Sequence, residues 1–311
     1  MTMALGAKPF RRCGGLLALA AAAALLLAGC DSAGAGGAAA AAVAARPAPA
    51  VQPVPDPSLL PADLRAIIDK GELTVALYAD DRYPFFYKNS RQELAGGDID
   101  LATDIAHQLG VEPVFLRTAA TFDEVVDQIV RGEADIAVSK LSVTLSRARK
   151  VKFTSPYLVL SQALLVNRTQ LAKTGREADD PLRVIDSLGA KVGIRQGTSF
   201  VDYADNLFPD AEKALYDDTG KMVDDLLQGK LFAILYDENE IKRTIYDNPQ
   251  FAISLKTVLL QGQRDPLAIA VAPDNDQLLY WLNLYLNLKY DGNLPRIDDW
   301  LTTYPSPEGS P

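Results

Sequence analysis

The chain has 311 residues, of which 48% are hydrophobic and 23% are charged, a composition typical of globular proteins rather than disordered or fibrous ones. Its net charge of −9 disfavours a nucleic-acid-binding protein, because such proteins hold phosphates with basic surfaces. Two cysteines and one histidine, His107, exclude a zinc ribbon and a disulfide scaffold and leave little for a Ser-His-Asp site.

The N-terminal residues are typical of an export signal. Three basic residues precede an apolar run over 16–28, which is too short for a comfortable membrane span. The run ends in Leu27-Ala-Gly-Cys30, which resembles the lipobox of bacterial lipoproteins. The resemblance implies a signal peptide over 1–29 and a lipidated, palmitate-bearing Cys30. An ordinary signal peptide is the alternative.

The next segment, residues 31–58, consists mostly of Ala, Gly and Pro. Such a composition cannot bury enough apolar surface to fold. We therefore expect residues 30–58 to form a lipidated, flexible tether that holds a folded body at a membrane, in the periplasm or an equivalent extracytoplasmic space. The last residues, 305–311, are expected to form a disordered tail.

The folded body alternates strand-like and helix-like segments. Short apolar runs predict strands, and apolar positions repeating every 3.6 residues between caps and Gly stops predict helices. In chain order the segments are a strand at 73–78, a helix at 97–109, a helix at 122–130, a strand at 135–138, a helix at 222–227, a strand at 231–236 and a helix at 276–289. The polar stretch 170–181 predicts a surface excursion. This alternation favours mostly parallel sheets covered by helices on both faces.

One helix–strand unit recurs 97 residues later in the chain. The matching residues are Val126 and Val223, Asp127 and Asp224, and Gly132 and Gly229. The recurrence predicts two lobes of similar build, with ordinary α/β regularity as the alternative.

The loops after the recurring strands hold candidate ligand-binding residues. In open α/β sheets, ligands bind beyond the carboxyl ends of the strands. Arg147 follows the first strand, beside a helix that Thr144 is expected to cap, and suits a carboxylate. Asp237 follows the second strand and suits a cation, and residues 195–199 open another helix. A base and an acid on opposite lobes suit a zwitterion, although surface charges and ordinary helix caps would look the same.

Six stretches, taken in order, resemble one protein family. They are residues 96–101, 135–147, 151–157, 192–198, 237–238 and 291–300. From residue 73 to 301 the chain resembles the periplasmic solute-binding proteins of family 3, which serve polar amino-acid ABC transporters.

The resemblance implies an α/β fold of the two-lobed, type II periplasmic-binding-protein kind, each lobe having a mixed, mostly parallel sheet flanked by helices. It implies two hinge crossovers, which we place near Leu160 and Ala268. One lobe would then comprise residues 59–160 with 268–304, and the other residues 161–267.

The resemblance also implies a site for both charged groups of an amino acid. Arg147 would pair with the α-carboxylate, and Asp237 would accept the α-ammonium. Hydroxyl or backbone N–H groups would assist Arg147 from three residues: Ser142, Thr198 and Ser199. The side chain of the ligand is expected among three others: Tyr83, Phe122 and Asp80.

Two basic residues set the expected ligand class. Lys140 stands where the family often has Ser, and Arg195 stands where it often has an apolar or Lys residue. Ser139, which precedes Lys140, is also expected at the site. Burying two cations is costly unless an anion compensates them. If both face the cleft, the ligand supplies a second negative charge, which favours glutamate or aspartate, then glutamine or asparagine. Both could instead face solvent, and Asp80 or Glu238 could neutralise either.

Two further residues depart from the family pattern. Gly97 stands where the family usually has an aromatic residue, and Phe232 replaces an acid and is expected in the core.

The predicted function is therefore a membrane-tethered, non-enzymatic substrate-binding protein of an amino-acid ABC importer. Its expected partners are a free amino acid, a membrane permease and, through the lipid, the membrane itself. It is expected to act as a monomer without nucleic acid, cofactor or metal. Two alternatives stay open: an enzyme resembling cyclohexadienyl dehydratase, with Glu238 or Asp80 as the acid, or a ligand-sensing partner of a membrane signalling protein.

Overall fold

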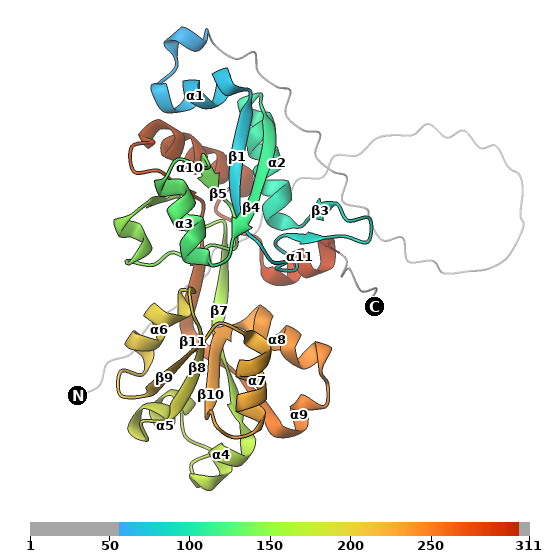
Figure 1. Cartoon of the computed structure of the whole chain (residues 1–311), viewed down its shortest axis with the longest axis vertical. Helices are drawn as coiled ribbons and strands as arrows, with labels where there is room; N and C mark the ends of the chain where they lie inside the picture. Colours follow the sequence, from blue (N-terminus) through green and yellow to red (C-terminus); the bar gives the residue numbers. More distant parts are fainter. Residues whose placement is uncertain (1–55, 305–311) are drawn as a thin grey trace, which may run out of the picture. The chain divides into compact units, whose positions relative to one another are not determined.

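The computed structural model describes residues 56–304 (Figure 1). The expected signal peptide over 1–29, the lipidation of Cys30, the tether as far as residue 55 and the tail over 305–311 lie outside the described residues. None of the helices between residues 56 and 304 is both long and apolar enough to cross a bilayer.

Lobe 1 is built around a five-stranded sheet with the strand order β4-β1-β5-β12-β6. Its strands are β1 (Glu72–Tyr78), β4 (Glu112–Ala119), β5 (Ile136–Ala137), β6 (Lys152–Phe153) and β12 (Ala270–Val271). Its helices are α1 (Ala62–Lys70), α2 (Gly97–Leu109), α3 (Phe122–Val130), α10 (Asp276–Tyr290) and α11 (Ile297–Thr303). Lobe 1 also contains two short 3-10 turns, η1 (Pro57–Leu59) and η2 (Arg147–Arg149), and a hairpin of β2 (Tyr87–Lys88) and β3 (Leu94–Ala95). Strands β4, β1 and β5 run parallel, and β12 is antiparallel to β5 and β6.

Lobe 2 is built around a second five-stranded sheet with the order β11-β7-β10-β8-β9. Its strands are β7 (Leu158–Asn167), β8 (Lys191–Arg195), β9 (Glu212–Tyr216), β10 (Ala233–Asp237) and β11 (Leu255–Leu267). Its helices are α4 (Arg168–Lys173), α5 (Pro181–Ser187), α6 (Phe200–Leu207), α7 (Thr219–Leu227), α8 (Glu238–Asp247) and α9 (Phe251–Ser254). Strands β10, β8 and β9 run parallel, whereas β7 is antiparallel to both of its neighbours.

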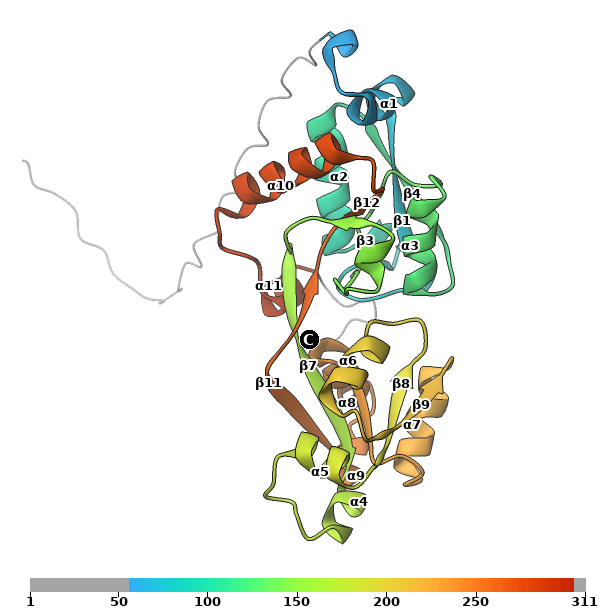
Figure 2. The same ribbon diagram turned by 90° about the vertical axis from the view of Figure 1, so that its left-hand side faces the viewer.

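Strands β7 and β11 connect the two lobes as one antiparallel ribbon (Figure 2). Their residues at one end, Leu158 and Leu267, pack in the core of lobe 1, while residues further along, such as Ala163 and Leu260, pack in the core of lobe 2. Leu160 lies in β7, and Ala268 directly follows β11. The mixed, two-lobed α/β fold expected from the sequence is confirmed.

Most local structure follows from short-range signals. Helix α3 begins where Thr121 accepts the backbone N–H of Glu124, as the capping sequence predicts. The stretch 170–181, which is expected to form a surface excursion, is mostly exposed, and it includes the end of α4 and the Asp180 cap of α5. Thr144 does not cap an α-helix: its hydroxyl accepts the N–H of Arg147 at 3.2 Å, at the 3-10 turn η2, whose N-cap is Ser146.

Gly97 leaves room for an aromatic ring from the other end of lobe 1. A Cβ atom at Gly97 would lie 2.4 Å from a ring carbon of Trp300, closer than real Cβ atoms approach other atoms. The Trp300 ring packs edge-on against Phe85 at 5.3 Å and parallel to Tyr157 at 6.1 Å between centroids. The indole of Trp300 therefore fills the space that an aromatic side chain at position 97 would need.

This packing predicts that Gly97→Ala lowers the free energy of unfolding by about 1–3 kcal/mol, because the added methyl group displaces a buried indole. The matched control is Gly220→Ala in the first turn of α7, where the new Cβ would meet only the Asp218 side chain, at 3.3 Å. Urea denaturation followed by tryptophan fluorescence measures both. Equal stability of the two variants would contradict the packing argument.

Candidate functional site

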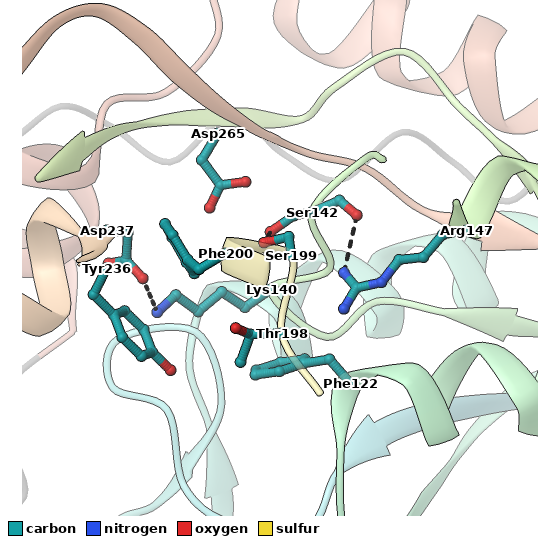
Figure 3. Close-up of a pocket in the computed structure, with 10 residues that line it drawn as sticks. All are labelled: Phe122, Lys140, Ser142, Arg147, Thr198, Ser199, Phe200, Tyr236, Asp237 and Asp265. Carbon is teal, nitrogen blue, oxygen red and sulfur yellow. Dashed lines mark hydrogen bonds and ion pairs between the residues drawn. The ribbon is translucent and has the colours of Figure 1, made fainter. Parts of the chain in front are cut away.

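A cavity lies between the two lobes, at the ends of the strands (Figure 3). Its volume is about 10 Å³, close to the space that one water molecule needs. The residues that line it are Phe122, Lys140, Ser142, Arg147, Thr198, Ser199, Phe200, Tyr236, Asp237 and Asp265. Seven of these ten are among the predicted site residues, and Arg147 and Asp237 lie in the same cavity although they are far apart in sequence.

Arg147 is a buried cation whose position is fixed by lobe 1. Its Nε and Nη2 both donate to Oδ1 of Asp123, at 3.0 and 2.9 Å, and its Nη1 donates to the carbonyl of Ser142 at 3.1 Å. A guanidinium has five N–H donors, so one donor remains on each of Nη1 and Nη2. Two such neighbouring donors can hold both oxygens of a carboxylate.

Hydroxyl groups from both lobes meet beside Arg147. The Ser199 hydroxyl, at the start of α6, donates to the Ser142 hydroxyl at 2.9 Å, and Thr198 donates to the carbonyl of Arg195 at 2.7 Å. Gly197 permits this approach, because its φ is 71° and a Cβ there would lie 2.8 Å from Thr121 of the opposite lobe. The predicted hydroxyl residues are therefore at the cavity.

Lys140 forms a buried ion pair across the two lobes. Its Nζ lies 2.9 Å from Oδ2 of Asp237 and 2.9 Å from Oε1 of Glu240, and its side chain is 4% exposed. Burial favours the neutral amine, but the two carboxylates outweigh that effect and raise the pKa of Lys140 above its ordinary value. Burial also raises the pKa of Asp237, and the Lys140 ammonium acts against that rise.

The backbone of Lys140 is held as firmly as its side chain. Its φ of 48° lies in the left-handed region that non-glycine residues rarely adopt, which indicates a strained position. Its N–H donates to the buried carboxylate of Asp98 at 2.6 Å, and the Tyr157 hydroxyl donates to the other oxygen of Asp98 at 2.9 Å. Desolvation raises the pKa of Asp98 to about 7.

Asp265 of β11 is a second carboxylate at the cavity, and it is 1% exposed. The hydroxyl of Tyr203 donates to its Oδ1 at 2.9 Å. No Lys or Arg of residues 56–304 forms an ion pair with Asp265. Desolvation, followed by the nearby charge of Asp237, raises its pKa to about 6.

A second, equally small cavity adjoins the first and shares Phe122, Thr198 and Tyr236 with it. Arg82 and Arg195 line this second cavity. Within the described chain neither guanidinium has a carboxylate within ion-pairing distance, and the buried Nε of Arg82 has no hydrogen-bond partner. Arg195 donates only to the carbonyl of Tyr216, at 3.2 Å. The second cavity is therefore basic.

Three predicted residues line neither cavity. Tyr83 donates its hydroxyl to the carbonyl of Tyr304 at 2.6 Å, so its ring lies elsewhere. The buried Ser139 accepts the N–H of Tyr78, and the exposed Asp80 accepts the hydroxyl of Tyr78, so both contact lobe 1 rather than the cavities. Tyr78 itself stacks on Phe122, with 4.8 Å between ring centroids, in the place expected for Tyr83.

Glu238, considered above as a proton donor, also lies away from both cavities. One of its oxygens accepts the N–H of Ser161 at 3.0 Å, and the other pairs with Lys242 at 2.8 Å.

The sequence analysis missed several residues of the site. They are Tyr78, Arg82, Asp123, Phe200, Tyr236, Glu240 and Asp265. Asp123 and Glu240 each stand in the first turn of a helix, where an acid is common for other reasons. Only contact with Arg147 and Lys140 distinguishes them.

Within the part of the chain that the structure describes, no group of three or more His, Cys, Asp or Glu side chains could hold a metal ion.

Residues 73–302 match the model of the bacterial extracellular solute-binding proteins, family 3. The chain belongs to this family. It is 29% identical over 223 residues to the ABC transporter arginine-binding protein 1 of Escherichia coli (strain K12), which covers 70% of this chain and 85% of that protein. This family member is thus similar to an amino-acid-binding component of an ABC transporter.

Two solved structures extend the comparison. The amino acid ABC transporter substrate-binding protein AbpA of Streptococcus pneumoniae, bound to L-arginine, is 28% identical with a TM-score of 0.60, covering 76% of this chain and 96% of that chain. An ancestral amino acid-binding protein, a precursor of cyclohexadienyl dehydratase, is 24% identical with a TM-score of 0.60, covering 78% of this chain and 99% of that chain. The second likeness is one of fold.

The raised pKa of Asp265 predicts how stability changes with pH. Its ordinary pKa is 3.8, so between about pH 4 and pH 6 the folded state binds more protons than the unfolded state. The free energy of unfolding therefore falls as the pH rises through this window, by about 2–3 kcal/mol from this group. Asp265→Asn should remove that part of the fall, so the variant exceeds the wild type in stability above pH 6. Urea denaturation at a series of pH values measures it, and identical pH profiles would contradict the assignment.

Proposed function

We propose that this family member is the substrate-binding component of an ABC importer and that its solute is an amino acid with an acidic or amide side chain. Glutamate and aspartate are the first candidates, followed by glutamine and asparagine. The observation that carries the proposal is the buried guanidinium of Arg147, which keeps two donors at a cavity between two lobes. The relatives named above support an amino acid as the ligand, and the preference for an acidic or amide side chain rests on the basic residues of the second cavity.

The α-carboxylate of the ligand would bind at Arg147. Asp123 already compensates the positive charge and orients the guanidinium, so the free donors are preorganised rather than mobile. Ser142, Thr198 and Ser199 line the same cavity beside the start of α6, and the hydroxyls of Thr198 and Ser199 would exchange their present acceptors for the carboxylate. This part of the site would be common to all amino acids.

The side chain of the ligand would extend past Phe122 into the second cavity. There Arg82 and Arg195 present two cations that no carboxylate of the described chain pairs with, and the Nε donor of Arg82 is unused. Both cations are half-buried and Glu240 acts on the charge of Arg82 alone, so a ligand with a second carboxylate would gain an interaction here that a neutral one would not. A cationic ligand such as arginine, which AbpA holds, would be repelled here.

The ammonium of the ligand would bind on the acidic side of the first cavity. Asp237 was predicted for this role, and Asp265 is a second carboxylate in the same cavity. Closure of the lobes about the β7–β11 ribbon would bury the ligand and present a closed form to a membrane permease. Lipidation at Cys30 would hold the protein at the membrane on the extracytoplasmic side.

Arg147→Ala should abolish binding of every amino acid, because the α-carboxylate is their common group. Removing one partner of a buried charge-assisted hydrogen bond costs about 2–5 kcal/mol, or about 30- to 5,000-fold in affinity. Arg149→Ala, two residues away and exposed, is the matched control. Calorimetric titration of the purified protein with L-glutamate measures both, and unchanged affinity in the Arg147 variant would refute the proposed site.

Arg195→Ala should reduce the preference for glutamate over glutamine by about tenfold, equal to about 1.4 kcal/mol, because the two ligands differ only in the charge of the side chain. Arg183→Ala, an exposed change in the same lobe, should leave the preference as it is. Competition titrations with both ligands give the ratio. If the ratio is the same in the wild type and the Arg195 variant, the assignment of the second cavity to the ligand side chain is wrong.

A further inference from the structure

The acidic side of the cavity contains two carboxylates in very different surroundings. Asp237 is 1% exposed and has a cation in contact, whereas Asp265 is equally buried and has only hydroxyl donors. A buried carboxylate without a cation is unfavourable unless something else compensates it. The question is which of the two is open to the ammonium group of a ligand.

Both oxygens of Asp237 already accept a hydrogen bond in this structure. Its Oδ2 accepts the Nζ of Lys140 at 2.9 Å, and its Oδ1 accepts the N–H of Glu240 at 3.0 Å as the cap of helix α8. The ammonium of Lys140 therefore stands where the ammonium of a ligand would have to bind.

Lys140 is not easily displaced from this position. Its ammonium also contacts Glu240, and its backbone is anchored by the hydrogen bond to Asp98. Moving the side chain away would take its ammonium out of contact with two carboxylates, in a cavity that has room for about one water molecule. A ligand that used Asp237 would have to bear that whole cost.

Asp265 has the properties that Asp237 lacks. The Tyr203 hydroxyl occupies part of its capacity, and an ionised carboxylate can accept about four hydrogen bonds. Asp265 and Arg147 line the same cavity, and the carbonyl of Ser142, another residue of that cavity, accepts Nη1 of Arg147. Figure 3 shows Ser142 and Ser199 lying between these two charged groups. The carboxylate and the ammonium of an amino acid are bonded to the same carbon atom, so they could contact Arg147 and Asp265 within this one cavity.

We propose that Asp265, and not Asp237, accepts the ammonium group of the amino-acid ligand, while Lys140 stays paired with Asp237 and Glu240 as an internal cation. The inference rests on the function proposed above and specifies where one group of the ligand binds. The ligand then supplies the only cation that Asp265 contacts, so ligand binding relieves a charge that the folded protein leaves uncompensated.

The test compares L-glutamate with glutarate, which has the same two carboxylates and lacks the ammonium. Calorimetric titration of the purified protein gives the affinity ratio of the two compounds. Asp265→Asn should lower the affinity for L-glutamate by about 100-fold and leave glutarate within about threefold, so that the ratio collapses. Asp217→Asn, an exposed change in the same lobe, should leave the ratio as it is.

A second variant examines Asp237 without leaving a charge unpaired. Lys140→Met combined with Asp237→Asn removes both partners together, and Glu240 keeps Arg82 and Arg243 nearby. This double variant should retain the preference for L-glutamate over glutarate. If the preference survives in Asp265→Asn and disappears in the double variant, Asp237 accepts the ammonium and the inference is overturned while the proposed function stands.

Two other results would also overturn the inference. Equal loss of L-glutamate and glutarate affinity in Asp265→Asn means that Asp265 supports the cavity without contacting an ammonium. This outcome can be measured with the Asp265 variant alone. Equal affinity of the two compounds in the wild type means that no ammonium is recognised at all. Failure of the wild type to bind any amino acid refutes the proposed function together with the inference.

Discussion

The balance of buried charge between the two lobes is the constraint on which the rest of the site depends. Arg147 is compensated by Asp123 from its own lobe, and Lys140 is compensated by Asp237 and Glu240 from the other lobe. An ion pair in a low-dielectric cavity offsets the cost of desolvation only when its geometry is close and its partners are held in place by secondary structure. Asp265 lies next to both pairs without a cation of its own.

The same charges connect the lobes mechanically. Lys140 comes from the loop after β5 and reaches the start of α8, so its ion pair spans the cavity rather than one wall of it. The Ser142–Ser199 hydrogen bond and the close approach at Gly197 join the lobes nearby. Strands β7 and β11 form the covalent connection. Opening of the lobes would therefore have to break polar contacts at the cavity proposed to bind the ligand, which would couple the conformation of the protein to what occupies that cavity.

Much of the fold could be predicted from the sequence because its signals are local. The cap at Thr121 and the apolar period that follows it place α3, and the loop after a buried strand places Arg147 beside the ligand cavity. Lys140 and Arg195 each line a cavity, which is one of the two placements that the sequence analysis left open. These residues lie directly after predicted strands, where topology leaves little freedom.

The remaining features depend on contacts between distant segments. Nothing near Asp265 in the sequence marks it, because it becomes a cavity residue only through the packing of β11 against β7 and α6. Tyr83 was expected beside the ligand, but Tyr78 stacks on Phe122 instead, since the Tyr83 hydroxyl finds a carbonyl at the far end of the chain. Likewise, the pairing of Lys140 with Asp237 follows from the closeness of two loops that are almost a hundred residues apart.

The central claim is that the lobes enclose an amino acid that carries a second negative charge, and a melting-temperature screen tests it most directly. The purified protein is heated with each of the twenty amino acids in turn. The account predicts that glutamate or aspartate raises the melting temperature most, since a ligand at about 100 times its dissociation constant stabilises the folded state by about 2.7 kcal/mol. A largest shift with arginine or lysine, or no shift with any amino acid, would contradict it.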